Sequence, residues 1–200
     1  MQMTPLLDDR RTPQFHVGIL RDISAERDQL EALASDAYHD ALTGLPNRRL
    51  LVDRFEQAAA HTRRSAQQLT LAVIDLNGFK EVNDTLGHRA GDELLQLVGT
   101  GLSQAIRAED TVARLGGDEF AVLIHSSQSY ESVPAVEARI RAAVGRPANI
   151  QGRQLRVSCS IGVGLYPADG GDFEALLEYA DRRMYAQKRR QARQSDRASA

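Results

Sequence analysis

The twelve residues RLGGDEFAVLIH, from Arg114 to His125, constrain the fold of this 200-residue chain more than any other stretch. Apolar residues flank Gly116 and Gly117, and paired glycines supply the positive φ angles that a tight hairpin turn needs. We therefore predict two strands, at residues 111–115 and 119–124, joined by the two glycines. Carboxylates follow the turn directly.

Helical and strand patterns alternate along the chain after the breaker cluster DALTGLPNRR, at residues 40–49. Apolar residues at helical spacing predict four helices, within residues 50–59, 94–106, 133–144 and 173–184. The apolar run LTLAVI predicts a buried strand at 69–74. Strict alternation predicts a long strand at 155–163, with which a short strand at 148–150 would pair through Gln151 and Gly152.

After the first of these helices the order of elements is strand, helix, strand, hairpin, strand, helix, strand. This order predicts an α/β (α+β) fold with a ferredoxin-like βαββαβ core and helices packed on one face of the sheet. We expect an N-terminal connector helix to precede this core, and the basic tail after residue 193 to be frayed.

The segment before residue 40 predicts a strand and then this connector helix. The strand covers residues 15–20. In the helix, Ile23, Leu30, Leu33 and Ala37 form a narrow apolar seam suited to pairing with another helix. A solvated connector helix without a partner is the alternative.

The composition limits the classes of partner. A net charge of -2 argues against a broad electrostatic contact with a nucleic-acid polymer, and leaves room for a local basic site. We expect no membrane segment, because no apolar run is long enough, and no signal peptide, because the N-terminus lacks the charged-then-apolar order. The single cysteine, Cys159, alternates with polar residues and is expected to be a buried thiol. These features predict a cytoplasmic protein.

Three carboxylates are expected at one edge of the predicted sheet. Asp75 directly follows one strand, and Asp118 and Glu119 follow the glycine turn of the hairpin. Carboxylates this close repel each other unless a cation is present, and Mg²⁺ prefers carboxylate and carbonyl oxygens. A solvated acidic hairpin without a metal is the alternative.

The stretch DLNGFKEVNDTLGHRAGDELL, residues 75–95, adds groups that could recognise a nucleotide. Lys80 could neutralise phosphate charge, and Asn83 and Asp92 could meet the donors and acceptors of a purine edge. Asp92 could equally be a helix-start residue near the positive end of the helix dipole. No GxxxxGK[ST] loop, no GxGxxG after a strand and no nucleophile set accompanies them.

Five separate motifs, in order, resemble those of a GGDEF domain. They are DALTGLPNR, DLNGFKEVNDTLGHRAGD, RLGGDEF, SIGVGLYPADG and LLEYADRRMYAQK, and the resemblance covers residues 37–193. It implies a fold like that of nucleotide cyclases and the polymerase palm. It also implies a diguanylate cyclase, which joins two GTP molecules into cyclic di-GMP and releases two pyrophosphates. Because each domain holds one GTP, the resemblance implies a homodimer, which would give the apolar seam a purpose.

The same resemblance implies the roles of individual residues. Glu119, Asp118 and Asp75 would be catalytic, and the metal, Mg²⁺ with Mn²⁺ as an alternative, would be bound by Asp75, the backbone carbonyl of Leu76, Asp118 and Glu119. The substrate-binding residues would be Asn83 and Asp92 for guanine, Lys80 and Lys188 for the phosphates, and Phe79, Gly116 and Gly117 close to the nucleotide.

RAED, residues 107–110, resembles the RxxD inhibitory site of the family. By this resemblance Arg107 and Asp110 would bind the product cyclic di-GMP and hold two domains apart. An ordinary i, i+3 salt bridge is the alternative, and a further contact from Arg139 or Arg141 stays open.

The chain departs from the family pattern at two places. Asn77 stands where many members have a second Asp, and Gln191, Ala192 and Arg193 replace the usual Gly-Arg-Asn. The missing arginine at 192 predicts weaker triphosphate binding unless Arg189, Arg190 or Arg193 replaces it. A catalytically weak module that binds GTP or cyclic di-GMP and regulates a partner is therefore the alternative function.

The N-terminal stretch FHVGILRDISAERDQL resembles the last strand of a PAS sensor domain with the exit that follows it. We therefore expect a PAS remnant at residues 1–22, a helical linker that could form a coiled coil at 23–39, a GGDEF domain at 40–193 and a frayed tail at 194–200.

Overall fold

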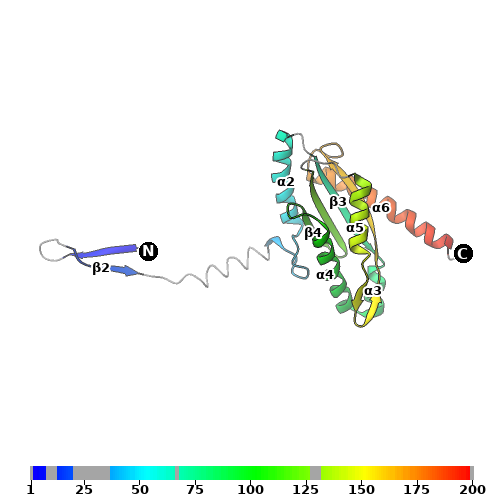
Figure 1. Cartoon of the computed structure of the whole chain (residues 1–200), viewed down its shortest axis with the longest axis horizontal. Coiled ribbons are helices and arrows are strands. Elements are labelled where there is room, and N and C mark those ends of the chain that lie inside the picture. The colour runs from blue at the N-terminus through cyan, green and yellow to red at the C-terminus, as the bar shows by residue number, and fades with distance from the viewer. Residues whose placement is uncertain (1, 8–12, 20–36, 66–67, 127–131, 199–200) are drawn as a thin grey trace. The chain divides into compact units, whose positions relative to one another are not determined.

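The protein is described from a computed structural model, which covers residues 2–7, 13–19, 37–65, 68–126 and 132–198. The chain divides into two compact units, Met1–Ala37 and Tyr38–Ala200 (Figure 1). The predicted helical linker, with the seam residues Ile23, Leu30 and Leu33, lies outside the described residues except at its last positions.

The first unit contains a two-stranded antiparallel ribbon. The expected strand is present as β2, Pro13–Ile19, and it pairs with β1, Gln2–Leu7, which the sequence analysis did not predict. Pro5 lies inside β1, and proline is compatible with this position because both strands of a two-stranded ribbon are edge strands.

The second unit is built on a four-stranded antiparallel sheet in the order β4-β5-β3-β8. The strands are β3 (Gln68–Asn77), β4 (Thr111–Gly116), β5 (Glu119–Ser126) and β8 (Ser158–Tyr166). Each neighbouring pair is antiparallel: β4 and β5 form a hairpin, whereas β3 pairs with β5 and β8, which are distant from it in the sequence. This is the strand order of a βαββαβ sheet, and the predicted fold class is confirmed.

Helices cover both faces of the sheet (Figure 1). The prediction of helices on one face of the sheet therefore holds only for the crossover helices α4 (His88–Ala105) and α5 (Val133–Val144), which pack against the even-numbered residues 72–76 of β3. The first and last helices, α2 (Arg48–Ser65) and α6 (Phe173–Ala198), pack on the opposite face against the odd-numbered residues 69–73. A strand that is buried on both faces reads as the continuous apolar run seen in the sequence.

Helix α6 lies unusually close to β8. A Cβ atom at Gly162 would lie 1.9 Å from the carbonyl oxygen of Ala180, and at Gly164 it would lie 2.9 Å from a methyl group of Leu176. From Ser160 onward, the small positions of the alternating pattern are therefore not a solvent face. Their small side chains let the helix backbone approach, and even Ser160 is fully buried.

Three local predictions need correction. The long strand is interrupted at Arg156 and Val157, so its first part forms a separate hairpin, β6 (Ala148–Ile150) with β7 (Arg153–Leu155). A short helix, α3 (Phe79–Leu86), was not predicted. The hairpin turn consists of Gly117 and Asp118, because Gly116 still pairs with Glu119.

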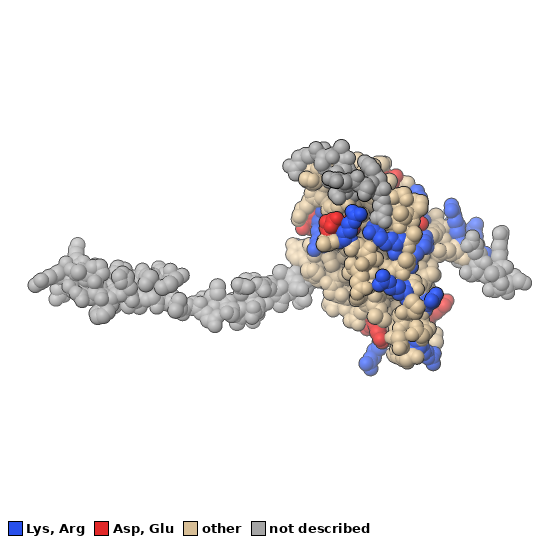
Figure 2. Space-filling model, in the orientation of Figure 1, with Lys and Arg blue, Asp and Glu red and all other residues tan. Residues whose placement is uncertain are grey.

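Charged side chains are distributed in separate groups over the visible face of the second unit (Figure 2). Across the described helices, none combines the length and apolar character needed to cross a bilayer. The Cys159 thiol is buried as expected, and burial raises its pKa to about 11.

Candidate active site

The ends of two neighbouring strands bring two of the three predicted carboxylates together. Asp75 near the end of β3 lies opposite Glu119 at the start of β5. The backbone N–H of Leu76 donates to the carbonyl oxygen of Asp118 at 3.3 Å, which joins the turn to β3. Gly117, at φ 52°, makes the turn, and a Cβ there would meet no atom within 4 Å, so the space above the turn is open.

Lys188 of α6 reaches the same place from the far end of the sequence. Its ammonium nitrogen lies 2.7 Å from Oδ1 and 2.8 Å from Oδ2 of Asp75. The Asp75 side chain is only 10% exposed, whereas that of Lys188 is 46% exposed. Because an unpaired buried carboxylate is costly, the ammonium group of Lys188 neutralises the charge of Asp75.

Glu119 lies in an excess of negative charge. Partial burial, and then the carboxylates of Asp181, Asp75 and Asp118, raise the pKa of Glu119 above its usual value, although Lys188 opposes them. Asp181 is a neighbour that the sequence analysis missed, because α6 carries it to the site from a distant part of the chain. Burial also raises the pKa of Asp181.

The acidic residues fit a divalent cation by the chemistry of their oxygens. Among the described residues no three Asp, Glu, His or Cys side chains converge into a group that could hold a metal as they stand. Asp75 instead takes Lys188 as its cation, and Glu119 stays close to several other carboxylates. A divalent cation held by Asp75, Asp118 and Glu119 would relieve this repulsion.

The predicted nucleotide-binding residues lie on and beside α3. Lys80 and Asp92 are exposed, and Phe79 is partly buried against the core. Asn83 Oδ1 is buried and has no hydrogen-bond partner. A Cβ atom at Gly91 would lie 2.0 Å from that oxygen, so the side chain at position 83 depends on glycine at 91.

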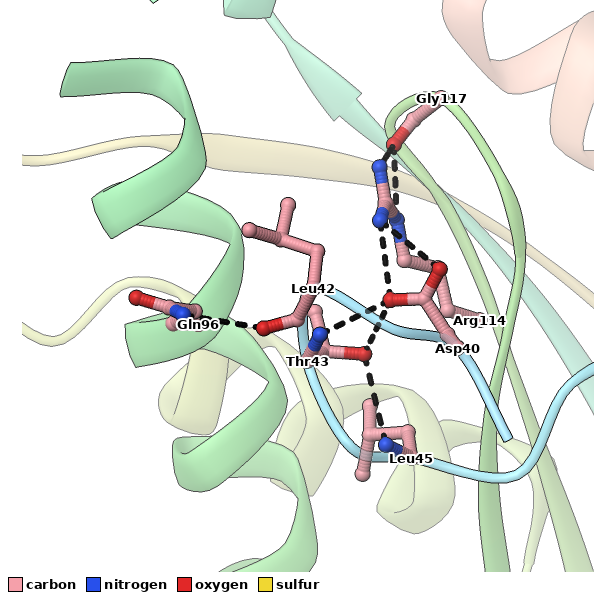
Figure 3. A network of polar contacts seen from close by, with 7 residues as sticks. All are labelled: Asp40, Leu42, Thr43, Leu45, Gln96, Arg114 and Gly117. Carbon is pink, nitrogen blue, oxygen red and sulfur yellow. Dashed lines mark hydrogen bonds and ion pairs between the residues drawn. The ribbon is translucent and has the colours of Figure 1, made fainter. Parts of the chain in front are cut away.

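An ion-paired network holds the hairpin turn from outside (Figure 3). Arg114 donates from Nη2 to the carbonyl oxygen of Gly117 at 2.7 Å and from Nη1 to Asp40 Oδ1 at 2.9 Å. Asp40 also accepts from the backbone N–H and the hydroxyl of Thr43. Burial alone would raise the pKa of Asp40, but the hydrogen bonds from Thr43 and Arg114 lower it overall.

Sequence reasoning missed this network, although a local signal was present. Asp followed three residues later by Thr, as in DALT, is a pattern in which the carboxylate bonds the nearby backbone. The distant partner, Arg114, carries no such signal.

The two residues predicted to bind product at the RAED turn, Arg107 and Asp110, differ in exposure to solvent. Arg107 is exposed. Asp110 is 6% exposed, and its two oxygens accept backbone N–H groups, from Arg107 at 3.1 Å and His125 at 3.0 Å.

The second unit closely matches known proteins. The family model "Diguanylate cyclase, GGDEF domain" matches residues 37–194. The diguanylate cyclase TpbB of Pseudomonas aeruginosa is 40% identical over 205 residues, which cover 94% of this chain and 47% of that protein. The bifunctional diguanylate cyclase/cyclic di-GMP phosphodiesterase MucR of the same species is 43% identical over 152 residues, or 76% of this chain and 22% of MucR. The chain thus spans less than half the length of these relatives.

Solved structures agree with this match. The GGDEF domain of TpbB has a TM-score of 0.72 and 39% identity, covering 76% of this chain and 89% of that one. The coiled coil and GGDEF domain of DgcB from Caulobacter crescentus, solved in complex with cyclic di-GMP, has a TM-score of 0.71 and 29% identity over 84% of this chain and 88% of that one. By sequence and by structure, the chain belongs to the GGDEF family.

Proposed function

We propose that the protein is a diguanylate cyclase, which condenses two GTP molecules into cyclic di-GMP across a homodimer. The observation that carries this proposal is the meeting of Asp75, Glu119 and Lys188 beside an open hairpin turn. Acidic groups for a cation and a basic group for phosphate are what phosphoryl transfer requires. The similarity to TpbB supports the same reaction.

The chemistry is a nucleophilic displacement at the α-phosphorus. The 3'-hydroxyl of one GTP attacks the α-phosphorus of the other, the bond to the β-phosphate oxygen breaks, and pyrophosphate leaves. Glu119 would take the hydroxyl proton, and its raised pKa suits a proton acceptor. The same step with the roles of the two nucleotides exchanged closes the ring.

The acidic residues would hold the divalent ion of the family. Asp75, the carbonyl of Leu76, Asp118 and Glu119 would bind Mg²⁺ or Mn²⁺, which when bound neutralises triphosphate charge and lowers the pKa of the attacking hydroxyl.

The remaining residues would bind and orient the nucleotide. Lys188 and Lys80 would contact the phosphates, and Phe79, Gly116 and Gly117 would lie close to the nucleotide. The unpaired oxygen of Asn83 supports a role for Asn83 and Asp92 in reading guanine, since a buried acceptor without a donor is costly unless a ligand supplies one.

The test is turnover of GTP by the purified protein in the presence of Mg²⁺, with cyclic di-GMP measured by chromatography. The wild type is expected to form the product, and Asp118→Ala and Glu119→Ala are expected to abolish it. Binding of GTP without product formation by the wild type would favour the regulatory module instead. Unchanged turnover in both variants would rule out the assigned chemistry.

Product inhibition is proposed at the RAED turn. Arg107 can be truncated without losing its backbone hydrogen bond to Asp110, so Arg107→Ala tests the exposed side chain alone. We expect cyclic di-GMP to inhibit Arg107→Ala about tenfold more weakly than wild type. Equal inhibition of the two proteins would contradict this site.

A further inference from the structure

A group of neutral polar side chains links α6 to the end of β3. Asn77 donates from Nδ2 to Gln191 Oε1 at 3.0 Å and to Ser158 Oγ at 2.9 Å. Ser160 donates from Oγ to Asn77 Oδ1 at 2.9 Å and lies 3.1 Å from Gln191 Oε1. We call Asn77, Ser160 and Gln191 the amide clamp.

The amide clamp lies beside the ion pair of the candidate active site. Asn77 is two residues after Asp75 on the same face of β3, and Gln191 is three residues after Lys188 on α6. One charged link and one neutral link therefore join the same turn of the helix to the same strand end. Fixing one link limits where the other can lie.

The backbone of β8 adds a further link to the same part of α6. Gln187 accepts a hydrogen bond from the backbone N–H of Ile161 at 2.6 Å. The helix is thus held against two strands just before and just after Lys188.

The chain contains very few lysines, and one of them lies in the candidate active site. Of 25 basic residues only Lys80 and Lys188 are lysines. An ammonium group is a compact point charge on a flexible stem, and its position depends on how the backbone below it is held. Arginines do not share this position: Arg189, Arg190 and Arg193 line a surface hollow with Ala186, on another side of the helix.

We propose that Gln191, held by Asn77 and Ser160, is a positioning residue for Lys188. It fixes the turn of α6 from which the ammonium group reaches Asp75 and, with nucleotide bound, the phosphates. The phosphate contact rests on the proposed function, whereas the placement of Lys188 does not. The NH₂ group of Asn77 donates to the side-chain carbonyl of Gln191. Because both side chains are neutral amides, this link adds no second carboxylate beside Lys188.

The test uses Gln191→Met, which keeps the length of the side chain and removes the amide. We expect the KM for GTP to rise about fivefold while kcat changes less than twofold. In a Lys188→Met background the same change is expected to add less than twofold, because there is no ammonium group left to position. Gln57→Met is the matched control, since Gln57 is exposed and bonds only Asp53 of its own helix among the contacts seen.

NMR of protein labelled at lysine gives a readout without nucleotide. The spectrum contains two lysines, Lys188→Met assigns them, and exposed Lys80 is the internal reference. We expect Gln191→Met to move the Lys188 ε-methylene signals towards those of Lys80, and Gln57→Met to leave them in place.

An unmoved Lys188 signal would overturn the proposal, and so would an equal rise in KM with and without Lys188. If the wild type makes no cyclic di-GMP, the proposed function fails, and the NMR comparison still decides whether Gln191 positions Lys188.

Discussion

The two ends of strand β4 carry acidic turns that differ in how their charge is satisfied. At the start of β4, Asp110 is buried, and its oxygens accept hydrogen bonds from two backbone N–H groups. After the end of β4, Asp118 is partly exposed, and partial burial of the Glu119 carboxyl together with the neighbouring carboxylates raises the pKa of Glu119. Acids of the same type therefore serve two purposes only a few residues apart.

The comparison shows how the surroundings of a carboxylate indicate its purpose. A carboxylate with both oxygens bonded to the backbone stabilises a turn. A carboxyl whose pKa is raised by burial and by neighbouring acids, as at Glu119, is typical of a functional site. The hairpin turn is instead held by Arg114, which bonds the Gly117 carbonyl and Asp40.

The largest expected effect separates the two turns by activity. Glu119→Gln should lower cyclic di-GMP formation about a thousandfold, because the proton acceptor is lost. Glu109→Gln, the same change at an exposed position of the RAED turn, should keep turnover within about twofold. Initial rates at saturating GTP measure both, and similar losses in the two variants would break the comparison.

The second effect separates the two turns by stability. Asp110→Ala should lower the free energy of unfolding by about 2–3 kcal/mol, because two partly buried N–H groups lose a charged acceptor. Asp118→Ala should change it by less than about 0.5 kcal/mol, since the Asp118 contact to β3 is made by its backbone oxygen. Urea unfolding checks both values, and an Asp110→Ala protein as stable as wild type would refute the structural role.

A smaller effect tests the external support of the hairpin turn. Asp40→Asn should cost about 1–2 kcal/mol in the free energy of unfolding, because the ion pair with Arg114 is lost while the side chain can still accept from Thr43. Asp53→Asn, at an exposed position of α2, is the control, and equal costs in the two proteins would argue against the network.

The smallest effect is in the pH dependence of stability, without cation or nucleotide. The pKa of Glu119 is raised in the folded protein, so ionised Glu119 destabilises the fold at neutral pH, and this loss disappears as pH falls to its usual 4.5. Glu119→Gln should therefore be more stable than wild type at neutral pH and equal to it in acid.

Asp40 should behave with the opposite sign. Its pKa is lowered, so its stabilisation is present above its usual 3.8 and is lost as pH falls through the lower folded value. The cost of Asp40→Asn should thus shrink in acid. Urea unfolding between about pH 3 and about pH 8 measures both variants, and a shared sign would contradict the assignments.

Much of the fold could be predicted because its signals are local. The run LTLAVI and the stripe Leu94, Leu95, Val98 and Leu102 report a strand and a helix through periodicity, and the order of elements leads to the sheet. The break at Arg156 and Val157 could not be seen, because the alternation continues across it. The second helical layer was also missed, because α6 packs on the glycines of β8, which carry no apolar side chain to signal the contact.

The sequence by itself determined the hairpin, the strand order and which acids follow which strands, because these depend on short-range pattern and connection rules. Only the tertiary structure decided that Lys188 neutralises Asp75, that Arg114 holds the turn through Asp40, and that Gln191 meets Asn77. These pairs are 113, 74 and 114 residues apart. No local pattern records such a separation, since it arises when helices pack on a sheet and bring distant side chains within hydrogen-bond reach.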